Sequence, residues 1–214
     1  MIKTLLLTFF LLSGCSFKTP KNEWQYKSAN SFNSYIKNFY SMDEALAKDN
    51  LKRAIKHAKK SADLTQLAKI YLGECALNIS VGREKMCSNY EEISGLVEDN
   101  SLDAYYNLLT LNISELKIEL LPQSYQAFAH MLIENKFKKA QDEILKIQKP
   151  SSALICAALI KENIDSDTRE KMIQLASFNG YKKSVLFWLE EKLKKSEDEA
   201  ERQKIKKRIS ILTT

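Results

Sequence analysis

The residue best placed for chemistry in this chain is Cys15, whose thiol follows a short apolar run. Lys3 precedes the run, which extends from Leu5 to Leu12, and Ser13 and Gly14 separate the run from the cysteine. A helix that crosses a bilayer needs about 20 apolar residues, and polar residues begin directly after the cysteine. The run is therefore too short to span a membrane and has the pattern of an export signal.

The segment Leu12-Ser13-Gly14-Cys15 resembles the lipobox of bacterial lipoproteins. In that family a lipid is attached to the cysteine thiol, the peptide bond before the cysteine is cut, and the new amino terminus is acylated. The resemblance implies that residues 1–14 are a signal peptide and that three acyl chains anchor Cys15. Ser16 follows the cysteine, and lipoproteins of this family that lack Asp at this position usually go on to the outer membrane. The resemblance therefore implies a location at the outer membrane, facing the periplasm. An ordinary secretory signal with a coincidental cysteine is the alternative.

The segment that follows is polar and contains Pro20. We interpret residues 15–30 as the lipidated cysteine and a flexible tether, and residues 31–214 as a single helical domain. Trp24 and Tyr26 are large side chains of this tether. They either lie in the membrane interface or pack on the first helix.

The other cysteines are Cys75, Cys87 and Cys156, which cannot all pair within one chain in an oxidising compartment. Val81-Gly82-Arg83 predicts a turn between Cys75 and Cys87, so a disulfide between these two residues would staple a helical hairpin. Such a bond would contribute about 3 kcal/mol of stability. Cys156 lies in an apolar segment, and we expect it to be a buried small hydrophobic residue.

Residues with the spacing of a catalytic or metal site are few. The chain has no Gly-Xaa-Ser-Xaa-Gly elbow, no phosphate-binding loop and no His-Glu-Xaa-Xaa-His motif. His57 and His130 are far apart in the sequence, and neither lies at a ligand spacing from a cysteine. The sequence therefore predicts no metal and no cofactor. Glu74 and Glu134 are the carboxylates to consider for a glycan-cleaving pair; solvent-facing or capping roles are the simpler interpretation.

The formal net charge of the chain is +6, with two basic runs near residues 52–60 and 192–208. The first run has helical spacing with alanine and isoleucine between the charges, and the second alternates with Glu and Asp. Both patterns are typical of solvated faces of amphipathic helices; contact with phospholipid or peptidoglycan is the alternative. Because an exported lipoprotein does not normally meet nucleic acid, we expect no nucleic-acid partner.

Composition predicts an all-α fold, since the chain has only 5 Gly and 3 Pro and few alternating runs. Helix starts are indicated by pairs at capping-box spacing, which are Ser41 with Glu44, Asp63 with Gln66, Ser88 with Glu91, Asp167 with Glu170, and Ser196 with Glu199. We expect about ten helices stacked as antiparallel hairpins. The expected ranges are 31–48, 51–61, 64–79, 88–97, 102–120, 123–135, 137–148, 151–163, 168–178, 181–195 and 199–211.

A short unit recurs where helices are expected to join. It reads polar, any, large apolar, basic, basic, small in residues 49–54, 135–140 and 179–184, with a weaker relative at 99–104. The unit resembles the turn between the two helices of a tetratricopeptide or Sel1-like repeat, which implies an array of stacked hairpins. The unit does not recur at a fixed interval of about 34 residues, so the array is irregular. An irregular helical bundle with coincidental turns is the alternative.

These observations favour a membrane-anchored, non-catalytic adaptor that holds a protein partner at the periplasmic face of the envelope. Stacked hairpins expose a concave row of side chains that can take a peptide or a helix. Aromatic residues dominate such contacts, and the candidates are Tyr71, Tyr105, Tyr106, Tyr125 and Trp188. Two alternatives are an envelope enzyme acting on peptidoglycan and a structural lipoprotein whose basic surface contacts lipid or cell wall.

Overall fold

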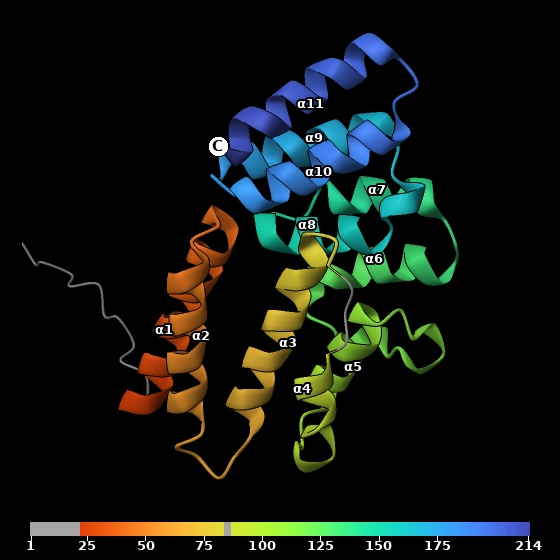
Figure 1. Ribbon diagram of the computed structural model, residues 1–214. Helices are drawn as coiled ribbons and strands as arrows, with labels where there is room; N and C mark the ends of the chain where they lie inside the picture. Colours follow the sequence, from red (N-terminus) through yellow and green to blue (C-terminus); the bar gives the residue numbers. More distant parts are fainter. Residues whose placement is uncertain (1–21, 84–86) are drawn as a thin grey trace, which may run out of the picture.

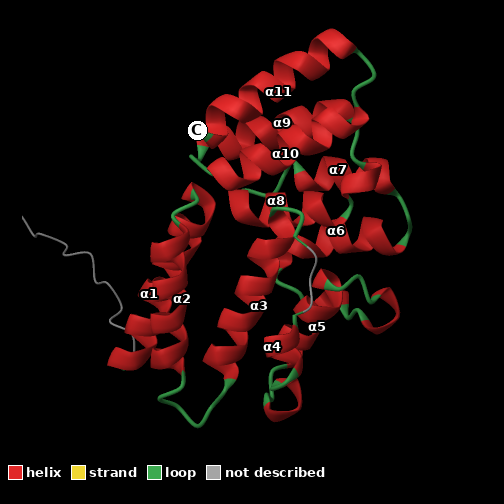
Figure 2. Ribbon diagram, in the orientation of Figure 1, coloured by secondary structure: helices red, strands yellow, loops and turns green. Residues whose placement is uncertain are grey.

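The computed structural model describes residues 22–83 and 87–214, and these residues form an all-α protein (Figures 1 and 2). Eleven α-helices and four 3₁₀ turns are present in the described part of the chain, which contains no strand. The predicted fold class is confirmed. Cys15 and the expected signal peptide lie outside the described residues.

The helices follow one another with short connections. The α-helices are α1 (Glu23–Ser41), α2 (Glu44–Ala58), α3 (Thr65–Ser80), α4 (Ser88–Glu91), α5 (Asn100–Leu109), α6 (Gln123–Ile133), α7 (Phe137–Ile144), α8 (Pro150–Leu159), α9 (Ser166–Phe178), α10 (Lys182–Lys195) and α11 (Glu199–Thr213). The 3₁₀ turns are η1 (Ser94–Leu96), η2 (Ile113–Glu115), η3 (Ile118–Leu120) and η4 (Lys161–Asn163).

The last eight residues of the expected tether belong to helix α1, so the assignment of residues 23–30 to a flexible segment is wrong. Two contacts explain the early start. The Asn22 side chain accepts a hydrogen bond from the Gln25 backbone N–H at 3.0 Å and caps the helix. The buried Ser28 hydroxyl donates to the Ala54 carbonyl at 3.0 Å, which ties this first part of α1 to α2.

The recurrent unit marks a helix junction at two of its three positions. Residues 135–140 lie at the junction of α6 and α7, and residues 179–184 at the junction of α9 and α10. There Asn135 and Gly180 adopt positive φ angles of 54° and 68°, a conformation that ends a helix. Residues 49–54 instead lie inside α2, where we expected a junction.

The true turn between α1 and α2 lies further toward the amino terminus. Met42 takes the left-handed conformation there, and Asp43 caps α2 by accepting from the Leu46 N–H. Aspartate also caps α9 and α11, where Asp165 and Asp198 replace the expected caps Asp167 and Ser196. In each case a carboxylate accepts a backbone N–H in the first turn, which explains the shift of two residues from the expected cap.

Two expected helices are much shorter than predicted. Helix α5 ends at Leu109, and the turns η2 and η3 replace the rest of the expected range 102–120. Leu111 has a positive φ angle of 57°, which breaks the helical path. Likewise α4 and η1 replace the single helix expected at 88–97.

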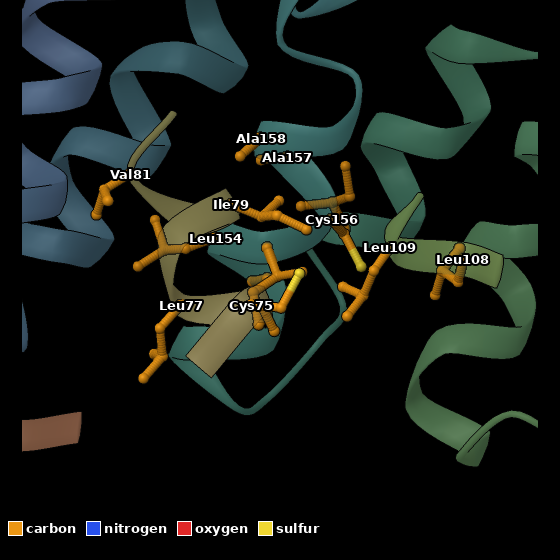
Figure 3. Close-up of a cluster of buried hydrophobic side chains, with 14 of the residues drawn as sticks. Cys75, Leu77, Ile79, Val81, Leu108, Leu109, Leu154, Cys156, Ala157 and Ala158 are labelled. Carbon is orange, nitrogen blue, oxygen red and sulfur yellow. The ribbon is translucent and has the colours of Figure 1, made fainter. Parts of the chain in front are cut away.

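The centre of the molecule is α8, in which every residue from Ser151 to Ala158 is buried. This helix packs against α3, α6, α7 and α9. Figure 3 shows Leu154 of α8 near Ile79 of α3, and Cys156 of α8 near Leu109 of α5. Cys156 is fully buried and has no disulfide partner, so the expectation for this residue is confirmed.

The structure joins Cys75 of α3 to Cys87, the residue before α4, in a disulfide with a Cα–Cα distance of 5.3 Å. The bond lies beside the turn at Gly82, which has a φ angle of 70°. A Cβ atom at Gly82 would overlap the Phe187 ring of α10, so the turn needs glycine for both its conformation and its packing. None of the helices in the described residues has the length and apolar character needed to cross a bilayer.

Candidate interaction surface

An apolar groove of about 480 Å³ opens on the surface between α7, α8 and α9. Its lining is mainly apolar and consists of Ile144, Leu145, Ile147, Ala153, Lys171, Met172, Gln174, Leu175 and Phe178. Ile144 and Met172 are almost completely buried and form its floor, whereas Leu145 is 40% exposed. Phe178 is 91% exposed, the largest exposed fraction among the large hydrophobic residues of the described chain.

The geometry of α9 explains why Phe178 remains exposed. The residues that α9 buries are Thr168, Arg169, Met172, Ile173 and Ala176, which recur at the spacing of one helical face. Leu175 and Phe178 continue a second apolar row from Met172 at intervals of three residues. Helix α9 is thus apolar over a wider arc than the core covers, and the second row borders the groove.

The charged residues that line the groove and its neighbouring hollow are mostly basic. Lys171 lines the groove, and Lys146 and Lys149 line the hollow, which measures about 560 Å³ and shares Ile147 with the groove. Glu143 is the acidic residue of the two linings, and it forms an ion pair with Lys146 at 2.8 Å. This leaves an apolar surface bordered by positive charge, which suits an apolar segment with acidic residues on its flanks.

The predicted contact residues lie elsewhere, and two of them are core residues. Trp188 is 0% exposed and Tyr125 is 7% exposed, so the expected exposure of these two rings is wrong. The Tyr125 hydroxyl donates to the Ser152 hydroxyl at 2.8 Å, and burial raises the Tyr125 pKa. Large aromatic residues at helical spacing have here filled the core between helices.

The other three aromatic candidates are partly buried, and none lines the apolar groove. Tyr105 lies 3.4 Å from Tyr125, hydroxyl to hydroxyl. The Tyr106 hydroxyl donates to Glu91 at 2.8 Å, and Tyr71 lines a small hollow beside the disulfide. Phe178 is not among the residues predicted from the sequence, although Met172, Leu175 and Phe178 form an apolar row that the sequence displays.

The two carboxylates considered for catalysis lie in different surroundings. Burial raises the pKa of Glu74, which lines a hollow of about 90 Å³ with Tyr71 and Asn89. Glu134 is exposed, and a hydrogen bond and the charge of Lys136 lower its pKa. Small-molecule sites usually measure about 300 Å³ or more, so the hollow at Glu74 is too small for a sugar ring.

Histidine, cysteine and carboxylate side chains form no group of three able to hold a metal ion in the described ranges. His57 lies near the end of α2 and His130 in α6. The groove combines a volume of about 480 Å³ with a mainly apolar lining. Comparison with protein-family models, with curated proteins and with solved structures finds no match to this chain.

Proposed function

We propose that this protein is a lipid-anchored adaptor of the bacterial envelope that binds an amphipathic, acidic segment of a partner protein in the groove between α7, α8 and α9. In this proposal Cys15 carries the lipid, the chain faces the periplasm from the outer membrane, and no reaction is catalysed. The observation that carries the proposal is Phe178, a large aromatic side chain left almost fully in solvent beside an apolar groove.

Burial of this surface would be favourable. An exposed phenylalanine gains roughly 2–3 kcal/mol when it is transferred from water to an apolar contact, and such residues often dominate the energy of an interface. Lys171 and Lys149 are exposed and form no ion pair in the described part of the chain, so they are available to acidic residues of the partner. Stacked helical hairpins present grooves of this kind.

The test is a crosslinked pull-down from membranes with the full-length anchored protein. We expect one dominant partner, recovered by the unaltered chain and lost in the Phe178→Ser and Cys15→Ser variants. The charge reversal Lys171→Glu should weaken recovery, because the proposed partner is acidic. Leu96→Ser is the matched control, since Leu96 is 70% exposed on η1 and does not line the groove.

Recovery of the same partner by Phe178→Ser would contradict the groove as its binding site. The substitution should leave the free energy of unfolding within about 0.5 kcal/mol of the unaltered protein, because an exposed side chain contributes little to the folded state. A chemical denaturation curve for each variant checks that a loss of partner does not reflect a loss of fold.

The second candidate is an enzyme that acts on peptidoglycan with Glu74 as its acid: burial raises the pKa of this carboxyl, but its hollow of about 90 Å³ would have to open to admit a sugar ring. This candidate predicts that the protein digests isolated sacculi and that Glu74→Gln abolishes the digestion. Absence of digestion by the unaltered protein would leave the adaptor as the proposal that remains.

A further inference from the structure

The start of α1 places the folded part of the chain close to the proposed lipid. Only seven residue steps separate Cys15 from Asn22, the cap of α1, and seven steps reach at most about 24 Å even when fully extended. The segment 16–22 contains Lys18 and Lys21 and no acidic residue. The first turn of α1 would therefore remain near the membrane surface if Cys15 is anchored.

That end of the molecule is basic. The first turns of α1 lie beside the end of α2, as Figure 1 shows at the lower end of both helices. Burial, followed by the charges of Lys60, Lys27 and Lys56, lowers the pKa of His57, which lies near the end of α2. Lys59 follows the last residue of α2 and is exposed.

The acidic residues at this end do not cancel the positive charge. Glu23 pairs with Lys27 at 2.5 Å, and the Asp63 carboxylate accepts the Thr65 N–H at 2.8 Å at the start of α3. Lys56, Lys59 and Lys60 are exposed, and no ion pair involves them within the described ranges. The lysines at this end, which are Lys27, Lys56, Lys59 and Lys60, outnumber the carboxylates of Glu23 and Asp63, so positive charge is left to interact with an external anion.

Two aromatic residues on the first turn of α1 lie at the same end of the molecule as these lysines. Tyr26 is 52% exposed and Trp24 is partly exposed. Tyr and Trp are the residues that lie at the level of lipid headgroups, because each ring has an apolar body and a polar edge. Lysine chains beside them bring positive charge to the same level.

We infer that the surface formed by Trp24, Tyr26, Lys27, Lys56, Lys59 and Lys60, here named the tether pole, binds the anionic headgroups of the membrane that holds the lipid anchor. This inference rests on the anchoring part of the proposed function. Contact through the tether pole orients the molecule. The groove on α7 and α9 lies away from the lower end of α1 and α2 (Figure 1), so the bound protein presents the groove to the periplasm rather than to the lipid.

The two tryptophans of the chain provide a direct test. Trp24 belongs to the tether pole, whereas Trp188 is fully buried and serves as an internal reference. The full-length lipidated protein is placed in vesicles of phosphatidylcholine, with and without phosphatidylglycerol, that contain brominated lipid to quench tryptophan fluorescence. We expect quenching of Trp24 to increase with the content of anionic lipid and to decrease at high salt, because salt screens charge.

The variant Lys56→Gln/Lys59→Gln/Lys60→Gln should weaken the response to anionic lipid by about 100-fold, at roughly fivefold for each lysine near the surface. The matched control is Lys204→Gln/Lys206→Gln/Lys207→Gln, which removes the same charge from exposed positions of α11. Helix α11 lies at the other end of the molecule (Figure 1). The control should respond as the unaltered protein does.

Two outcomes would overturn the inference: quenching independent of lipid charge, or equal losses in the two triple variants. Flotation with phosphatidylcholine vesicles separates these outcomes from failure of the anchor. A chain that floats without charge-dependent quenching retains the anchor and contradicts the tether pole. If the unaltered protein does not float, or if the Cys15→Ser variant floats as well as the unaltered protein does, the anchoring on which the inference rests is contradicted.

Discussion

The tether-side part of the helical hairpin α1–α2 and the centre built around α8 and α10 bury very different side chains. Near the tether, a small separate cluster joins α2 to α3 and consists of Ala54 and Ala58 of α2 and Leu67 and Ile70 of α3. At the centre, Trp188, Phe128 and Leu154 are almost fully buried in one continuous core. Small residues let helices approach closely but bury little area, whereas large residues bury much more.

Aromatic rings of α1 hold the hairpin α1–α2 against the rest of the molecule. A Cβ atom at Gly73 of α3 would overlap the Phe32 ring of α1, so these helices meet at a close approach. On the other side, the rings of Tyr40 and Tyr181 stack at 4.1 Å between centroids. The hairpin is thus held by contacts with α3 and with Tyr181. The end of the hairpin that carries the tether pole exposes its lysines to solvent. Apolar burial, by contrast, fixes the centre.

Removal of a central side chain should have the largest effect on stability. Trp188→Ala should lower the free energy of unfolding by about 3–5 kcal/mol, because it opens a cavity in a packed core. Ile70→Val, in the small cluster, should lower it by only about 1 kcal/mol. Chemical denaturation followed by circular dichroism measures both without depending on tryptophan. Equal losses would show that the two regions do not differ in the way described.

Loss of the disulfide should have the next largest effect. Reduction, or the Cys75→Ala/Cys87→Ala variant, should cost about 3 kcal/mol, because the unfolded chain regains the freedom of the closed loop. Peptide mapping without reductant should recover the two cysteines joined. The buried Cys156 provides the control: Cys156→Ala keeps the disulfide, so its stability should fall on reduction as that of the unaltered protein does, whereas the double variant should not respond to reductant. Both thiols free in protein isolated from the envelope would contradict the pairing.

The smallest predicted effect concerns the contact between the hairpin and α10. The buried Lys183 ammonium donates to Glu44 at 2.6 Å and lies 4.0 Å from the centre of the Phe39 ring. The hydrogen bond from Lys183 lowers the Glu44 pKa below its usual 4.5. The contribution of Glu44 is therefore complete above the pKa of the unfolded chain and is lost as pH falls through the lowered value.

Glu44→Gln should destabilise the protein by about 1 kcal/mol near pH 7, since the carboxylate is largely exposed. The difference from the unaltered protein should shrink as the solution is acidified below pH 4.5. Unfolding curves of both proteins at several pH values measure this difference in the free energy of unfolding. Glu134→Gln removes the same charge at an exposed pair and should show no comparable difference. A difference that grows on acidification would have the wrong sign for this contact.

The sequence predicted the fold where local signals act alone. The positive φ angles at Asn135 and Gly180 follow from residue types that tolerate them, so the two junctions were readable. The unit at 49–54 has the same pattern yet lies within α2, because packing on α1 stabilises a continuous helix there. The start of α1 was missed for a similar reason: the contact from Ser28 to Ala54 joins residues 26 positions apart.

The site was less predictable than the fold. Tyr125 and Trp188 were plausible contacts from their types alone, and only the arrangement of neighbouring helices shows that both are covered. Phe178 belongs to an apolar row that the sequence displays. Whether another helix covers that row depends on the crossing of α7, α8 and α9, which is not a property of α9 itself.

The sequence by itself determined the helical class, the burial expected for Cys156, and the pairing of cysteines across a short turn, because these depend on residue type and on spacing within one hairpin. Only the tertiary structure decided which aromatic side chains remain in solvent and which lysines gather beside the first turn of α1. Both depend on contacts between segments distant in the chain, whose approach is set by the packing of whole helices rather than by local pattern.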